Sequence, residues 1–191
     1  MTTPSGQLKN LIEKSRVLGL SSDQTLTQGT RQLLTMADQE RRLLDHDELA
    51  QICADSGTNT TLPRLLQTKA DALVEAARNH LLQEQPELTV EGGALYPKDR
   101  AEACWRDCWN FLRVITYAVA TGRSQFTDSQ GMTALGELYV LMDVPMEGMK
   151  IALNQLQQLT LNETQDPSEQ ALIRACFTHL LTTLNKTAIK R

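Results

Sequence analysis

Residues 104–113, which read CWRDCWNFLR, are the stretch that decides how this chain is interpreted. They lie in a segment of helical pattern and place a thiol, a guanidinium, a carboxylate and two indoles on about three turns of helix. Asp107 and Cys108 lie three and four residues after Cys104, so each projects from nearly the same face as Cys104. Arg106 projects about 100° round the helix from Asp107, and its long side chain can bend toward a ligand beside that face. This combination suits a flat, apolar ligand that carries NH groups and carboxylates, such as a linear tetrapyrrole.

Helical periodicity extends over most of the remaining chain. Pro97 suits the first turn of a helix, and Gly122 is a natural residue just past a helix end. No internal repeat and no strand hairpin is visible, and the proline residues are confined to helix starts and linkers. The sequence therefore predicts an all-α protein. Its expected helices cover about residues 8–19, 23–36, 45–55, 62–84 and 97–122, segments starting near 127 and 145, and residues 167–187.

Size and charge exclude several classes of protein. The chain has 191 residues, of which 41% are hydrophobic, enough for one domain with a sizeable core. Its net charge is −4 and its basic residues form no long run, so nucleic acid is not an expected partner. No apolar run approaches the roughly 20 residues of a membrane span, and residues 1–6 lack the apolar core of a signal peptide. We therefore expect no membrane insertion.

The four cysteines indicate a reducing, cytoplasmic compartment, because Cys104 and Cys108 are too close along one helix for an easy disulfide. A metal site is not expected, since the three histidines His46, His80 and His179 are scattered and no second cysteine pair completes four ligands. The same scattering argues against haem. No nucleophile elbow, P-loop, dinucleotide glycine motif or zinc-protease motif is present, so the sequence does not predict an enzyme.

Further motifs accompany the decisive stretch in a fixed order. Upstream lies GGALYP at 92–97, and downstream follow LRVITYAVATG at 112–122, LGELY at 135–139 and DVP at 143–145. Together with the Cys-x-Arg-Asp motif that begins at Cys104, they resemble the phycobiliprotein family, nearest to the allophycocyanin type. The resemblance covers roughly residues 36–160.

This resemblance implies a globin-like fold with extra N-terminal helices that mediate dimerisation. It suggests an N-terminal helical extension at residues 1–34 and a globin-like bilin-binding domain at residues 35–191. It also implies a homo- or hetero-oligomer built through the N-terminal helices. The implied cofactor is a linear tetrapyrrole, phycocyanobilin or a related bilin.

The resemblance assigns roles to three residues of the Cys-x-Arg-Asp motif. Cys104 falls where the family attaches its bilin through a thioether. Asp107 matches the aspartate that accepts hydrogen bonds from the central pyrrole nitrogens, and a carboxylate there favours the protonated pigment. Arg106 matches the arginine that pairs with a propionate, which a planar guanidinium suits.

Five further residues are candidates for the same pocket. Lys98 and Arg100 precede Cys104 where basic residues often point toward the propionates, and Tyr117 matches a family tyrosine near the pocket. Trp105 could wall the pigment by stacking or fill the core or an interface. Cys108 departs from the family pattern, and its role stays open.

Three functions remain open from the sequence. The departures from the antenna pattern favour a globin associated with bilin biosynthesis, which would bind or carry bilins near their synthetic enzymes. The first alternative is a light-harvesting subunit of the phycobilisome antenna, with other antenna subunits as partners. The second alternative is a pigment-free helical interaction module.

Overall fold

The computed structural model describes residues 4–188 of the chain, with side chains described for residues 6–186. Within this part the chain is all-α, as predicted, and its sole strand-like pairing is an isolated antiparallel bridge between Leu18 and Thr127. The described elements are α1 (Pro4–Lys14), η1 (Leu20–Ser22), α2 (Gln28–Gln39), α3 (His46–Ser56), α4 (Thr61–Thr68), α5 (Ala70–Glu84), η2 (Pro86–Thr89), α6 (Lys98–Thr121), α7 (Ser129–Leu141), α8 (Met146–Leu161) and α9 (Pro167–Ala188).

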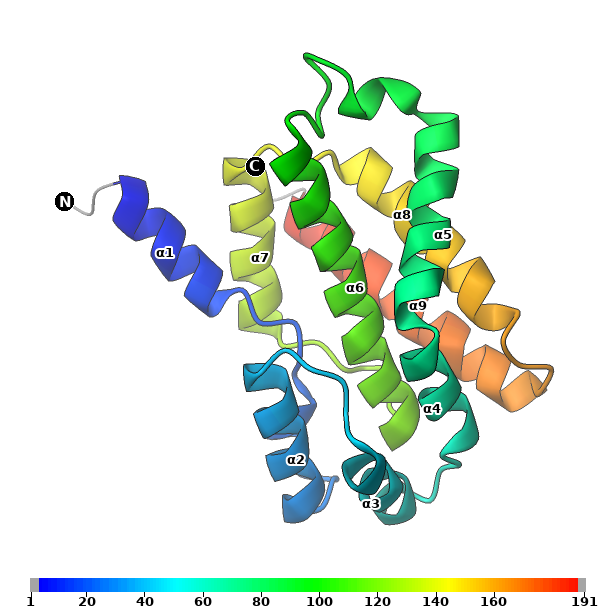
Figure 1. Ribbon diagram of the computed structural model, residues 1–191. Helices are drawn as coiled ribbons and strands as arrows, with labels where there is room; N and C mark the ends of the chain where they lie inside the picture. The colour runs from blue at the N-terminus through cyan, green and yellow to red at the C-terminus, as the bar shows by residue number, and fades with distance from the viewer. Residues whose placement is uncertain (1–3, 189–191) are drawn as a thin grey trace.

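Helix α6 is the centre of the molecule (Figure 1). Its second half is buried on every side from Phe111 to Thr121, because α3, α4, α5, α8 and α9 all pack against it. A helix that is apolar all round belongs in such a position. Gly122 ends α6 in the left-handed conformation with φ of 65°, which confirms the helix end predicted from sequence. The first half of α6, by contrast, keeps one face open toward a cavity.

Two predicted helix boundaries were wrong near the N-terminus. The helix expected over residues 8–19 ends at Lys14, because residues 17–19 pair instead with the segment before α7. There Gly19 N donates to the Phe126 carbonyl oxygen at 2.7 Å, and Asp128 N donates to that of Val17 at 2.9 Å. The next helix, expected from residue 23, begins at Gln28.

The cap of α2 explains that later start. The Thr27 side chain accepts a hydrogen bond from Thr30 N and so caps the helix. The single helix expected over residues 62–84 is two helices, α4 and α5. Only Lys69 departs from helical geometry between them, with φ of −98° and ψ of 3°, so the apolar spacing continues across the break and does not reveal it.

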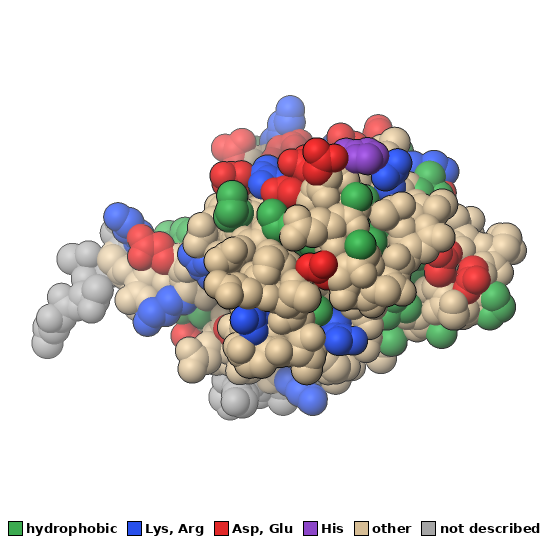
Figure 2. Space-filling view, turned by 90° about the horizontal axis from the view of Figure 1, so that it is seen from below, with side chains coloured by type: hydrophobic (Ala, Val, Ile, Leu, Met, Phe, Trp, Pro, Cys, Tyr) green, Lys and Arg blue, Asp and Glu red, His purple; other side chains and the backbone are tan. Residues whose placement is uncertain are grey.

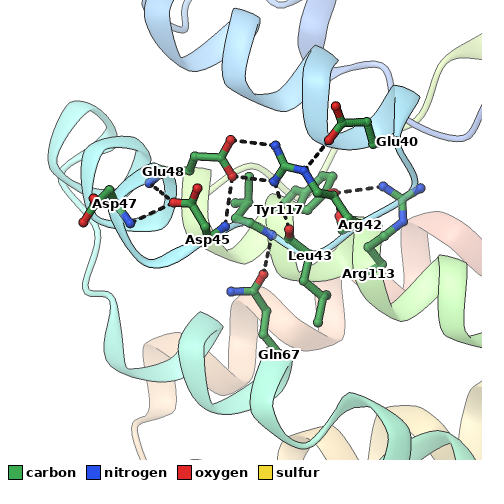
Figure 3. A network of polar contacts seen from close by, with 10 residues as sticks. Glu40, Arg42, Leu43, Asp45, Asp47, Glu48, Gln67, Arg113 and Tyr117 are labelled. Atoms are coloured by element: carbon green, nitrogen blue, oxygen red, sulfur yellow. Dashed lines mark hydrogen bonds and ion pairs between the residues drawn. The ribbon is translucent and has the colours of Figure 1, made fainter.

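The corner between α2 and α3 is fixed to α6 by a network of polar contacts (Figure 3). Arg42 forms a bidentate ion pair with Glu48, at 2.6 and 2.8 Å, and the Tyr117 hydroxyl of α6 donates to the Arg42 carbonyl oxygen. Leu44 N donates to the Gln67 side chain of α4 at 2.8 Å. Because both ends of this corner are fixed, the residues just before it, at the C-terminus of α2, are held beside α6.

The surface carries charges of both signs. On the end of the molecule shown in Figure 2, lysines and arginines are interspersed with acidic side chains rather than gathered in one patch. None of the described helices has the length and apolar character needed to cross a membrane.

Candidate functional site

A cavity of about 520 Å³ lies along the open face of α6, within the size range of small-molecule sites. Helix α7 forms the opposite wall, and residues 142–145 close one end. The C-terminus of α2 and the segment from α1 to residue 17 form the remaining sides. Figure 1 shows α6 and α7 side by side, with α1 beyond α7.

The cavity brings together four of the predicted residues: Arg100, Cys104, Arg106 and Asp107. Three of them follow the helical spacing of one face, since 100, 104 and 107 are separated by four and three residues. The Cys104 thiol is buried at the cavity wall. Arg100 Nη2 donates to the carbonyl oxygens of Met142 and Asp143, at 3.2 and 2.8 Å, and so fastens the end of α7 to α6.

Asp107 is half-buried at the cavity wall. Burial raises the pKa of its carboxyl, while a hydrogen bond from Tyr139 and the charges of Arg106 and Arg41 oppose that rise. The Tyr139 hydroxyl donates to Asp107 Oδ2 at 2.9 Å. The carboxyl is therefore held in position from α7, and burial disfavours its charged form, an environment in which it can accept hydrogen bonds from a cationic or NH-bearing group.

This environment predicts the pH dependence of the pigment-free protein. A carboxyl with a raised folded-state pKa stays protonated where the unfolded chain has already lost its proton, so stability falls as pH rises through that window above 3.8. We expect Asp107→Asn to be at least as stable as the wild type at neutral pH, and to lose less stability as pH rises. Urea unfolding at a series of pH values measures this, with the exposed Asp99→Asn as control. A clear loss of stability at neutral pH would show that the carboxylate stabilises the fold.

The other four predicted residues are not among the described residues that line the cavity. Lys98 is exposed at the start of α6 and is not among the described residues that line the cavity. Trp105 packs on the α5 side of α6, where the Arg78 guanidinium lies 5.6 Å from the ring centroid. Trp109 faces α5 as well and donates to Asp71 Oδ1 at 2.9 Å. Residue 105 is one step from the cavity stripe, which turns its indole toward α5.

The thiol of Cys108 contacts that of Cys104 but faces the core. Its Sγ lies 3.8 Å from Met149 Sδ of α8. The neighbouring Cys104 thiol and burial raise the pKa of Cys108 well above its ordinary value, so it stays protonated and is a poor nucleophile.

Tyr117 has a structural role: its hydroxyl accepts a hydrogen bond from Arg113 Nη1 at 2.9 Å and donates one to the α2–α3 corner.

Sequence reasoning missed several cavity residues, of which Arg113 is the clearest. Its Nη2 forms a 2.8 Å ion pair with Asp38 Oδ1 of α2, and the two side chains are only 5% and 13% exposed. Among the described residues, Arg113 Nε has no hydrogen-bond partner. A single arginine within the apolar run at 111–120 was the available signal, because a buried charge requires a partner. Tyr139 ends the LGELY motif but was not assigned to the pocket, and Arg41 carried no signal.

The charges that line the cavity are predominantly basic, although the chain as a whole is acidic. Such a lining favours a ligand with negatively charged groups. The described residues contain no cluster of three His, Cys, Asp or Glu side chains that could hold a metal ion. The lining includes five arginines and three acidic residues: Arg16, Arg41, Arg100, Arg106, Arg113, Glu13, Asp38 and Asp107.

Comparisons with known proteins agree on one family. The model of the phycobilisome protein family matches residues 32–184. The C-phycocyanin beta subunit of Mastigocladus laminosus is 27% identical over 139 residues, which is 71% of this chain and 80% of the relative. The allophycocyanin subunit alpha-B of a Nostoc species is 31% identical over 134 residues, 69% of this chain and 83% of the relative. Helix α1 lies outside the matched region.

Proposed function

Since this chain belongs to the phycobilisome protein family, a family of globin-like all-α proteins, we propose that it binds a linear tetrapyrrole in the cavity along α6 as a light-harvesting subunit. One observation carries the proposal. The thiol, the arginine and the carboxylate of the Cys-x-Arg-Asp motif all line a single cavity. Helix α7 adds the Tyr139 hydroxyl, and Arg16 and Arg41, which follow α1 and α2, add further guanidinium groups.

Cys104 is the proposed attachment residue. The pigment supplies the visible absorption and an exocyclic double bond. Addition of the Cys104 thiol across that bond forms one S–C bond and moves the thiol proton to the neighbouring carbon, so the step needs no oxidant or reductant. Cys104 suits this role better than Cys108, because it lines the cavity while Cys108 is turned into the core.

Asp107 and Arg106 are proposed to recognise the two polar parts of the pigment. The Asp107 carboxylate would accept hydrogen bonds from pyrrole NH groups and stabilise their protonated form. Arg106 is exposed at the cavity rim, where its guanidinium can pair with a propionate. Tyr139 would keep the Asp107 carboxyl in place through its 2.9 Å hydrogen bond.

Asp107→Asn in the pigmented protein is expected to weaken and blue-shift the long-wavelength absorption band and to lower its fluorescence. The amide keeps the shape but removes the charge that favours the cationic pigment, a contribution of about 1.5–3 kcal/mol for a charge-assisted hydrogen bond. Absorption spectra across a pH titration measure the change, and circular dichroism checks that helicity is kept. A spectrum and a titration identical to the wild type would place the pigment elsewhere.

The relatives support the light-harvesting function better than the biosynthetic one. Both relatives are by name subunits of phycocyanin or allophycocyanin, and the matched family is that of the phycobilisome. We therefore propose antenna subunits as partners, with oligomers formed through the N-terminal helices.

Light scattering of the pigmented protein, alone and mixed with an allophycocyanin subunit, tests whether such oligomers form. A monomer under both conditions at micromolar concentration would contradict it.

Co-expression with haem oxygenase and a bilin reductase tests pigment binding itself. We expect a coloured protein whose band fluoresces in the presence of zinc on a denaturing gel. A well-folded but colourless product would favour the pigment-free interaction module instead.

A further inference from the structure

Helix α1 lies outside the region matched by the family, yet it borders the cavity. Two stripes of the helix face different surroundings. Leu8, Ile12 and Ser15, at spacings of four and three residues, line the cavity along α6. Gln7, Leu11 and Lys14 belong to the neighbouring stripe, on the side of a second, more polar hollow beside α7, and Leu11 is 9% exposed.

Residues 15–19, which follow α1, pack closely against the start of α7. Besides the Leu18–Thr127 bridge, two glycines allow backbone to approach backbone. A Cβ added at Gly131 would lie 1.9 Å from the Arg16 carbonyl oxygen, and one at Gly19 would lie 2.6 Å from Thr127 backbone atoms. Neither position has room for a larger residue, so the close packing of this segment on α7 requires glycine at both.

The segment presents exposed side chains, both apolar and charged, to the cavity. Ile12 is 46% exposed although it lines a cavity, and an apolar side chain gains free energy when an apolar surface covers it. Arg16, also exposed, adds a guanidinium to the same lining. An apolar contact next to a cation matches a flat ring system that carries carboxylates.

We propose that the N-terminal segment 8–17 is a wall of the pigment site that covers the cavity and its ligand, with Leu8 and Ile12 against the rings and Arg16 toward a carboxylate. This inference rests on the proposed function. The segment would shield the pigment from solvent and restrict its torsional freedom, both of which favour fluorescence.

Two variants change the wall in different ways. Leu8→Ser combined with Ile12→Ser keeps α1 but makes its cavity face polar. Gly131→Ala places a Cβ where the Arg16 carbonyl oxygen lies and displaces the segment without deleting it. Met36→Ser is the control for the first, because Met36 is 51% exposed and lies outside the described cavity lining. Gly148→Ala is the control for the second, since its added Cβ would meet Leu88 at an ordinary 3.5 Å.

Each protein is measured with and without pigment. In the phycocyanobilin-loaded proteins, quenching of pigment fluorescence by acrylamide should rise severalfold in both wall variants and stay unchanged in both controls. In the pigment-free proteins, N-ethylmaleimide should label Cys104 severalfold faster in Gly131→Ala, because the cavity is then uncovered.

Unchanged quenching and unchanged labelling in the wall variants, with helicity retained, would overturn the inference. If the wild type took up no pigment under any condition, the proposed function would fail, and the labelling of Cys104 would still decide whether the segment covers the cavity.

Discussion

Cys104→Ser is expected to abolish all pigment that survives denaturation, while Cys108→Ser should leave covalent loading intact. A serine hydroxyl is a far weaker nucleophile than a thiol and does not add to the pigment double bond. Cys108 is turned toward Met149 in the core, and the neighbouring Cys104 thiol and burial raise its pKa, so we expect it not to take over the role. The measurement is zinc-induced fluorescence of the protein band on a denaturing gel after co-expression with the bilin pathway.

The pair is well matched, because both cysteines are buried residues of α6 one helical turn apart. General damage to the helix would therefore lower loading in both variants. Covalent pigment in Cys104→Ser, or its loss only in Cys108→Ser, would refute the assignment.

Asp38→Ala is expected to cost about 3 kcal/mol of unfolding free energy, the lower end of the range for breaking a buried ion pair. The variant leaves the Arg113 guanidinium buried with its 2.8 Å partner gone, and Arg113 Nε already lacks a partner among the described residues. The partial exposure of Asp38 and the remaining contact with the Tyr117 hydroxyl limit the loss. Urea unfolding of the pigment-free protein measures it.

The double variant Asp38→Leu with Arg113→Met supplies the control. Removing both charges together avoids the uncompensated cation, so we expect its stability to lie near that of the wild type. If Asp38→Ala were as stable as the wild type, solvent rather than the carboxylate would be screening Arg113, and the ion pair would not hold α2 against α6.

The sequence alone was enough for the all-α class and for the central helix. Its apolar residues recur at helical spacing, and Pro97 and Gly122 mark its ends through local backbone preferences. It also put Cys104 and Asp107 on one face of α6, although it wrongly put Cys108 there too, because residues three or four apart project alike in any helix. These are properties of a single segment, so no knowledge of its neighbours was needed.

The surroundings of that face depended on tertiary structure. Which side of α6 borders α5 and which borders the cavity is set by helix packing, and this turned Trp105 and Cys108 away from the site. Tyr139 is 32 residues from its partner Asp107 in sequence, and Asp38 is 75 residues from its partner Arg113. No local sequence pattern encodes contacts over such separations.

The N-terminal segment gives the sharpest contrast. Its apolar period predicted a helix through residue 19. Instead, the backbone groups of residues 17–19 form hydrogen bonds with residues 126–128, which a continued helix could not form. Gly131 permits that approach, yet in the sequence it is one glycine among ten. Local periodicity thus specified the helices and their polar faces, whereas the cavity exists only because long-range packing brings four separate segments around one of those faces.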